Sequence, residues 1–208
     1  LKKETICQDE WGNYGIICQS VRDSVHLDEE TKTAYPELSQ SLTQLRNEQT
    51  EEITLFMDNF VGMAQEEAAT NEDFYGYTSE CEFFVQRADN QILSIRETHY
   101  EYSGSARPMS GNFGENFDPV TGKKLLITDV VKDMPELIRL LDEKLIEKYG
   151  EEAFYESPKE LMEEYSPEYF YWTMSYQGLS VYFHAMDIGA YGINQHMITL
   201  WFDEHPEL

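Results

Sequence analysis

The spacing of apolar residues changes once in the first half of the chain, and this change limits the possible folds. From Leu38 to Ala64, apolar residues recur mostly at three- and four-residue steps, which places them on one face of a helix. After the sequence TNEDF the step becomes two, and Tyr77, Cys81 and Phe83 alternate with polar residues, as in a strand with one buried face. We therefore expect a long helix followed by a strand. The helical face comprises Leu38, Leu42, Leu45, Ile53, Phe56, Phe60 and Ala64.

Turn-forming residues mark further strands. The sequence DEWGNYG predicts a turn between strands at Glu4–Gln8 and Tyr14–His26. Asp89-Asn90 suits a turn between the alternating strand and a partner at Ile92–Tyr102, in a register that the sequence leaves open. A further short strand is expected at Lys124–Thr128.

Capping residues predict two shorter helices in the C-terminal half. Asp133 stands where an N-cap is expected, and Gly150 lies just past the end of the first helix. Ser157 and Glu160 have the spacing of a capping box, which predicts a second, short helix ending near Tyr165.

The last third of the chain reads as a sheet. A two-residue turn at Gln177-Gly178 would join strands at Phe170–Ser175 and Leu179–His184, and Met197–Phe202 would close the sheet. The resulting register pairs Met174 with Val181, Trp172 with Phe183, Thr173 with Tyr182 and Tyr171 with His184. One face of this hairpin is apolar, and Tyr171 and Tyr182 on the other face could stack on sugars.

Together these elements predict an α+β fold, because the strand pairs are joined by tight turns. Antiparallel sheets of hairpins would pack against the long N-terminal helix and the two shorter helices of the C-terminal half. No β-α-β alternation favours a doubly wound parallel sheet.

Residues 100–125, YEYSGSARPMSGNFGENFDPVTGKKL, are rich in glycine but do not have the spacing of a phosphate-binding loop. They carry neither GxGxxG nor GxxxxGK[ST] and precede no helix within reach. Ser105 also lacks the GxSxG context of a nucleophile. In the second half, Asp118-Pro119 is expected to begin a tight reversal that Gly122 closes. In the first half, the glycines let a surface loop bend.

The charge of the chain excludes some partners. Fifteen Lys and Arg against 40 Asp and Glu give a net charge of −25, which repels nucleic acid and anionic lipid and attracts cations. The same acidity also suits a role in solubility alone. No run approaches the roughly 18 apolar residues that a membrane helix needs. The chain begins with Leu1 rather than Met. We therefore expect a missing upstream segment, such as a signal, an anchor or a membrane span.

Cysteine and histidine spacing predicts no metal site and no cofactor. Three cysteines occur without a CxxC pair, and five histidines are scattered without HExxH. His184 lies near Asp187 in sequence, but a histidine at a strand end more often forms an ordinary hydrogen bond. If Gly12-Asn13 turns a hairpin, Cys7 would lie opposite Cys18, which leaves a disulfide or two free thiols open.

Two loops combine glycine with aromatic, Arg or Met residues, a composition suited to recognition. They are residues 103–116 and 186–195. The alternative is that both only connect neighbouring elements.

The same segments resemble the RsiV-like extracytoplasmic domain family. The run YSGSARPMSGNFGENFDPVTGKKLLITDV is similar to its turn, Asn-x-Asp-x-x-Thr-Gly-Lys segment and Leu-rich continuation, with matches at Asn116, Asp118, Thr121, Gly122 and Lys123. The run GLSVYFHAMDIGAYGINQHMITLWFDE looks like the closing segment of the family. The first strands and AYPELS resemble the smaller domain that usually precedes it. The resemblance covers nearly the whole chain.

The resemblance implies a small domain over residues 1–72 and an RsiV-like domain over 73–208, packed as one unit. In that family the domain serves an anti-sigma factor that binds lysozyme, or accompanies peptidoglycan deacetylases. It thus implies a non-catalytic ligand-binding or sensor domain at the cell surface, anchored by an N-terminal segment. The expected partner is a cationic protein such as lysozyme, and the alternative is an accessory domain that binds peptidoglycan fragments.

The resemblance also places the partner-binding residues. They are expected at Ser105, Arg107, Pro108, Asp187 and Tyr191. Ser105 and Arg107 replace the Gly and His of the family turn, and an Ala replaces the Pro expected before Tyr191.

Overall fold

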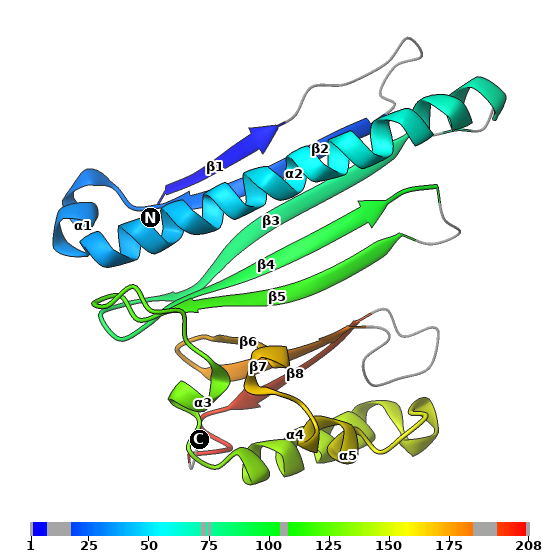
Figure 1. The fold of residues 1–208 in the computed structure, drawn as a ribbon. Coiled ribbons are helices and arrows are strands. Elements are labelled where there is room, and N and C mark those ends of the chain that lie inside the picture. The colour runs from blue at the N-terminus through cyan, green and yellow to red at the C-terminus, as the bar shows by residue number, and fades with distance from the viewer. Residues whose placement is uncertain are drawn as a thin grey trace. The chain divides into compact units, whose positions relative to one another are not determined.

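The computed structural model divides the chain into two compact units, each built from segments that are distant in sequence (Figure 1). The N-terminal unit comprises Leu1–Phe83 and Glu97–Gly111, and the C-terminal unit comprises Phe84–Arg96 and Asn112–Leu208. The domain boundary near residue 72, which rests on the family resemblance, stays a prediction. The structure describes residues 2–7, 18–71, 74, 76–104, 108–184 and 195–206.

The fold is α+β, as predicted. A five-stranded sheet has the order β1-β2-β3-β4-β5. Its strands are β1 (Lys2–Cys7), β2 (Cys18–His26), β3 (Tyr77–Ala88), β4 (Leu93–Tyr102) and β5 (Met109–Phe117). A second sheet contains three strands in the order β6-β7-β8. They are β6 (Tyr171–Met174), β7 (Gly178–His184) and β8 (Gln195–Trp201), and all neighbours in this sheet are antiparallel.

The first strand pair has a different register from the predicted one. β1 and β2 are antiparallel, with Cys7 opposite Val21 rather than opposite Cys18. The alignment of Cys7 with Cys18, which a turn at Gly12-Asn13 would give, is therefore wrong. Cys18 instead lies opposite Tyr77 of β3, and this β2–β3 pair is parallel. Residues 8–17 lie outside the described part of the chain.

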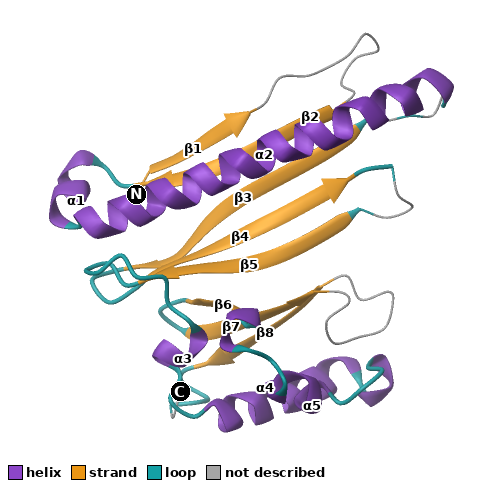
Figure 2. Cartoon of the chain, viewed as in Figure 1, coloured by secondary structure: helices purple, strands orange, loops and turns teal. Residues whose placement is uncertain are grey.

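A long helix makes the parallel pair possible. Helix α2 (Pro36–Thr70) follows the short α1 (Glu29–Ala34) and returns the chain so that β3 can run in the same direction as β2. Helix α2 packs along the sheet in the N-terminal unit (Figure 2), and four residues of its predicted apolar face, Leu38, Leu42, Phe56 and Ala64, are buried. Phe60 lies 4.8 Å from Phe56 and 5.9 Å from Tyr77, measured between ring centroids.

The C-terminal unit has its own core between helix α4 (Met134–Tyr149) and the three-stranded sheet. Leu137, Leu141 and Leu145 occupy the buried face of α4, and Trp172 is 2% exposed. The smaller elements are α3 (Ile127–Val130), η1 (Glu151–Ala153), α5 (Pro158–Glu163) and η2 (Pro167–Tyr169). No helix in the described ranges combines the length and the apolar character needed to cross a membrane.

The predicted caps of α4 and α5 are confirmed. The Asp133 side chain accepts a hydrogen bond from the Glu136 amide at 3.1 Å, and Gly150 ends α4 with φ of +82°. The Ser157 hydroxyl accepts from the Glu160 amide at 3.4 Å. Local sequence therefore sets the ends of these helices.

Two local predictions around the glycine-rich stretch are wrong. Residues 109–117, expected within a surface loop, form strand β5. Lys124–Thr128, expected as a strand, contributes an isolated bridge between Lys124 and Phe117 before α3 begins at Ile127. The predicted reversal between them is confirmed, because Asp118 accepts from the Val120 and Thr121 amides and Gly122 has φ of +68°.

The β6–β7 register also differs from the prediction. Tyr171 lies opposite Tyr182, and Trp172 lies opposite Val181. The turn residues are Tyr176-Gln177, one position earlier than expected, so each partner shifts by two residues and each face keeps its residues. Ser175 accounts for this turn, because its hydroxyl accepts hydrogen bonds from the Gln177 and Gly178 amides, both at 3.1 Å.

A glycine and an asparagine of β5 bring this strand against β6 in the C-terminal unit. A Cβ atom on Gly114 would lie 1.6 Å from the Trp172 carbonyl oxygen, so only glycine fits there. The Asn116 amide donates to the same carbonyl oxygen at 2.7 Å, and the Ser94 hydroxyl donates to the Asn116 side-chain oxygen at 2.6 Å. Ser94 in turn accepts from the Met174 amide at 2.8 Å. The glycine predicted to bend a loop instead permits close backbone packing.

We predict that Gly114→Ala is strongly destabilising. The added methyl group overlaps a backbone oxygen that cannot move without shifting β6, so we expect a cost of at least about 3 kcal/mol, or a fall of about 6 °C or more in the thermal midpoint. The matched control is Gly62→Ala in α2, where a Cβ meets nothing within 4 Å. This control should be neutral or slightly stabilising in the same calorimetric measurement. Equal midpoints for the two variants would contradict the proposed packing.

Candidate functional site

The structure describes only one of the five predicted partner-binding residues. Pro108 is exposed immediately before β5. Ser105, Arg107, Asp187 and Tyr191 lie outside the described residues. Their role as a binding surface therefore stays a prediction from the family resemblance.

One end of the three-stranded sheet brings two turns together in the C-terminal unit. Gly178 at the start of β7 pairs with Trp201 at the end of β8, and the Phe202 amide donates to the Gln177 carbonyl oxygen at 2.9 Å. A Cβ atom on Gly178 would lie 2.6 Å from the Leu200 carbonyl oxygen. These contacts hold the β6–β7 turn beside the chain that follows β8.

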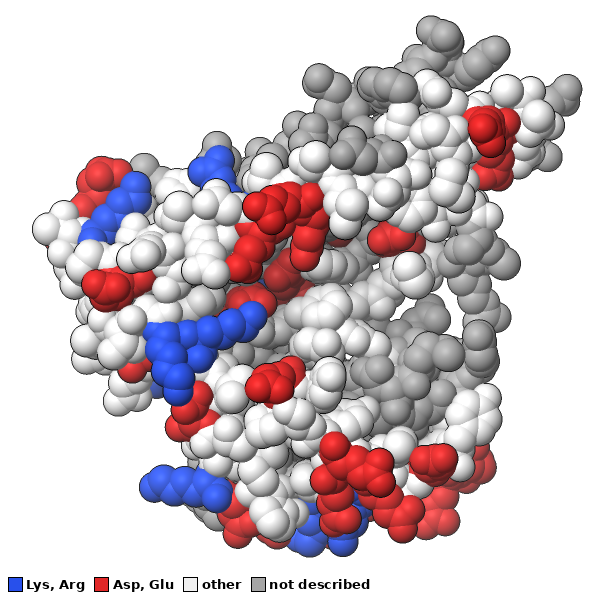
Figure 3. All heavy atoms as spheres, in the orientation of Figure 1, with Lys and Arg blue, Asp and Glu red and all other residues white. Residues whose placement is uncertain are grey.

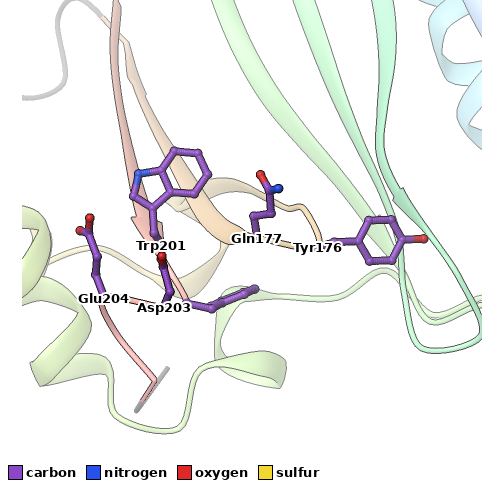
Figure 4. A pocket seen from close by; sticks show the side chains of 6 residues that line it. Tyr176, Gln177, Trp201, Asp203 and Glu204 are labelled. Carbon is purple, nitrogen blue, oxygen red and sulfur yellow. The ribbon is translucent and has the colours of Figure 1, made fainter.

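An open pocket of about 610 Å³ lies between these turns (Figure 4). Trp201 is 42% exposed and Tyr176 is 64% exposed. In Figure 4, Gln177 lies between these two aromatic side chains, Asp203 lies below Trp201, and Glu204 lies on the side of Trp201 away from Tyr176. The lining residues are Tyr176, Gln177, Trp201, Phe202, Asp203 and Glu204.

The backbone and side chains around the pocket limit its movement. After β8, the Trp201 carbonyl oxygen accepts from the Glu204 and His205 amides at 3.1 and 2.9 Å. The Tyr176 hydroxyl donates to the Ala88 carbonyl oxygen at 3.1 Å, and the Arg87 guanidinium lies 5.3 Å from the centre of its ring. These contacts fix the Tyr176 side chain and the backbone at Trp201, and a side chain that is already held in place loses little entropy when a ligand binds.

The pocket chemistry suits a ligand that is both cationic and partly apolar. The exposed indole of Trp201 offers contact area and attracts cations through its π electrons, and the Tyr176 ring, which already has the Arg87 guanidinium beside it, adds contact area. Asp203 and Glu204 are exposed carboxylates beside the indole. Sequence reasoning placed Trp201 in the closing strand but did not select it, because exposure at a strand end follows from tertiary packing.

The proposed sugar-stacking face is wrong for Tyr182. Its side chain is 3% exposed and shares a hydrogen bond of 2.7 Å with the Thr173 hydroxyl. Tyr171 packs against Phe113 of β5 and His184, with ring centroids 4.9 and 4.8 Å apart. Strand β5, which the sequence prediction lacked, contributes Phe113 to the contacts of this face.

The histidine considered as a metal ligand forms an ordinary contact. The His184 Nε2 atom lies 3.2 Å from the Asn112 carbonyl oxygen, to which its N–H can donate. Its sequence neighbour Asp187 lies outside the described residues.

Two solved structures have a similar fold over the whole chain. A member of the DUF3298 family from Bacteroides fragilis matches with a TM-score of 0.67 and 15% identity. The match covers 100% of this chain and 92% of the Bacteroides chain. A DUF3298 family protein from Pseudomonas aeruginosa matches with a TM-score of 0.57 and 15% identity, covering 100% and 93%. At this identity the likeness concerns the fold alone. No family model and no curated protein matches the sequence.

We predict that the burial of Tyr182 makes stability fall at high pH. Burial raises the pKa of its phenol above the ordinary value, and the hydrogen bond with Thr173 offsets part of this effect. Because the folded pKa is the higher one, the unfolded chain loses this proton first. The stabilisation that the protonated Tyr182 phenol contributes to the folded state is therefore complete below about pH 10. It is lost as the pH rises through the pKa of Tyr182 in the folded protein.

Urea unfolding of wild type and Tyr182→Phe at about pH 8 and about pH 11 would measure this contribution. The wild type should lose more stability between the two conditions than Tyr182→Phe. The control Tyr155→Phe changes a side chain that is 75% exposed and should follow the wild type. Identical alkaline losses in wild type and Tyr182→Phe would show that Tyr182 contributes nothing to this pH dependence.

Proposed function

We propose that this chain is a non-catalytic ligand-binding or sensor domain of RsiV type that works outside the cytoplasm and binds a cationic protein such as lysozyme. The observation that carries the proposal is the aromatic and acidic pocket at the end of the β6–β7–β8 sheet. Lysozyme as the ligand, cell-surface location and anchoring by an N-terminal segment come from the family resemblance of the sequence. The fold likeness to DUF3298 proteins is compatible with such a domain and assigns it no ligand.

The charge of the chain supports a cationic partner. The net charge of −25 attracts a basic protein over about a Debye length, roughly 8 Å at physiological salt. In the C-terminal unit, acidic side chains gather over the α4–α5 region (Figure 3). The exposed acids there include Glu151, Glu152, Glu156, Glu160, Glu163 and Glu164. A diffuse field of this kind increases the rate of encounter, whereas the pocket supplies a defined contact.

The pocket also favours a second candidate, an accessory domain that binds peptidoglycan fragments. An exposed indole face can stack on a sugar ring, and Gln177 and the two carboxylates can bind sugar hydroxyls. This candidate now rests on Trp201 rather than on the buried Tyr182.

We predict that Trp201→Ala weakens lysozyme binding by at least about tenfold, because tryptophan is enriched among the interface residues whose truncation costs about 2 kcal/mol or more. Isothermal calorimetry at low and physiological salt would measure the dissociation constant. The double variant D203N/E204Q should reduce affinity most at low salt and should flatten the salt dependence.

Two control variants distinguish binding at the pocket from attraction by the overall charge of the chain. Tyr155→Ala removes an exposed aromatic residue elsewhere in the same unit, and E151Q/E152Q removes the same charge beside α4. Both should bind within about threefold of wild type, apart from a small loss at low salt. An absence of heat with lysozyme under both salt conditions would exclude it as the ligand.

Peptidoglycan fragments provide the test of the second candidate. Binding of muropeptides that is lost in Trp201→Ala, without any binding of lysozyme, would favour the accessory role. Binding of lysozyme that Trp201→Ala leaves intact would exclude the pocket as its site.

A further inference from the structure

Cys81, Glu97 and His99 bring three different metal-binding groups together in the N-terminal unit. Cys81 lies on β3, and Glu97 and His99 lie on the neighbouring strand β4. The Glu97 Oε1 atom is 3.0 Å from the Cys81 Sγ atom and 2.5 Å from the His99 Nε2 atom. All three potential ligand atoms lie within 4.8 Å of one another.

The cluster is largely removed from solvent. Cys81 is 1% exposed, Glu97 is 6% exposed, and the His99 side chain is 30% exposed. Gln49 of α2, itself 3% exposed, places its amide nitrogen 3.4 Å from the same Glu97 oxygen. A buried carboxylate is costly unless charges and hydrogen bonds compensate it, and here the polar atoms of three side chains lie around one oxygen.

We infer that Cys81, Glu97 and His99 form a binding site for one zinc ion. Thiolate, carboxylate and imidazole are all ligands of zinc, whereas calcium and magnesium prefer sets of oxygen atoms. One divalent ion with one thiolate, one carboxylate and a neutral imidazole has no net charge, which suits a buried position. Gln49 would orient Glu97 from the second shell.

The distances are compatible with this assignment after small side-chain movements. Tetrahedral zinc with the usual bond lengths separates its ligand atoms by about 3.3 to 3.5 Å. The two short contacts to Glu97, now 3.0 and 2.5 Å, would each open by about 1 Å or less. The third ligand pair already lies within 4.8 Å. The partly exposed imidazole of His99 offers the ion a route from solvent.

Cobalt(II) is a suitable probe, because a thiolate ligand gives a charge-transfer band in the near ultraviolet. The full chain, first treated with a chelator, should bind a single cobalt ion with this band, and zinc should displace it. Zinc at about one hundred times its dissociation constant should raise the thermal midpoint by about 5 °C or more. Cys81→Ser should abolish the band, and His99→Gln should weaken affinity by at least about tenfold.

The double variant C7S/C18S removes the other two cysteines and should keep the band and the zinc-dependent shift. Circular dichroism would verify that each variant is folded, and H99Q decides the matter if C81S does not fold. The inference is overturned if the wild type gives neither the band nor the shift. It is also overturned if the band survives in folded C81S, if it disappears in folded C7S/C18S, or if H99Q binds as tightly as wild type.

Discussion

The buried amide of Asn116 is the interaction on which the C-terminal unit depends most. Its side chain accepts from Ser94 of β4 and donates to the Trp172 carbonyl oxygen of β6, and Ser94 accepts from Met174. Loss of the amide would leave buried partners unsatisfied, at about 1 to 3 kcal/mol each. The network fixes β6, β6 fixes the register of β7, and β7 with β8 positions the two turns around Trp201. The candidate pocket is therefore a consequence of polar contacts at the opposite edge of the sheet.

Local chemistry explains which elements could be predicted from the sequence. The α2 face repeats within the helix itself, and the caps at Asp133 and Ser157 act within three residues, so a single sequence contains the required information. Strand β5 is different, because Gly114 and Asn116 act on Trp172, more than fifty residues away. In isolation, the glycines of β5 look like turn formers, and only the packed structure reveals the close backbone approach.

The contrast between local and long-range determinants also applies to the candidate binding sites. The partner-binding residues predicted by resemblance lie in two loops, of which the described residues include Pro108 alone. The pocket depends on a turn at Tyr176-Gln177, one position from the predicted turn, and on the pairing of Gly178 with Trp201. The Cys81, Glu97 and His99 cluster has no sequence motif, because neighbouring strands bring its members together and metal motifs describe ligands that are close in sequence.

The acidity of the chain helps to decide which carboxylates are informative. Most of the 40 acidic residues can serve solubility, and an exposed carboxylate says little about a site. Glu97 and Glu115 differ from these exposed acids because they are only 6% and 8% exposed. The cost of burying each carboxylate must be offset by nearby charges or hydrogen bonds. Glu115 has an ion pair of 2.7 Å with Lys124, whose side chain is 58% exposed, and this arrangement fits a structural role. Glu97 instead has a thiol and an imidazole against one oxygen atom, and thiolate, carboxylate and imidazole are all groups that bind zinc.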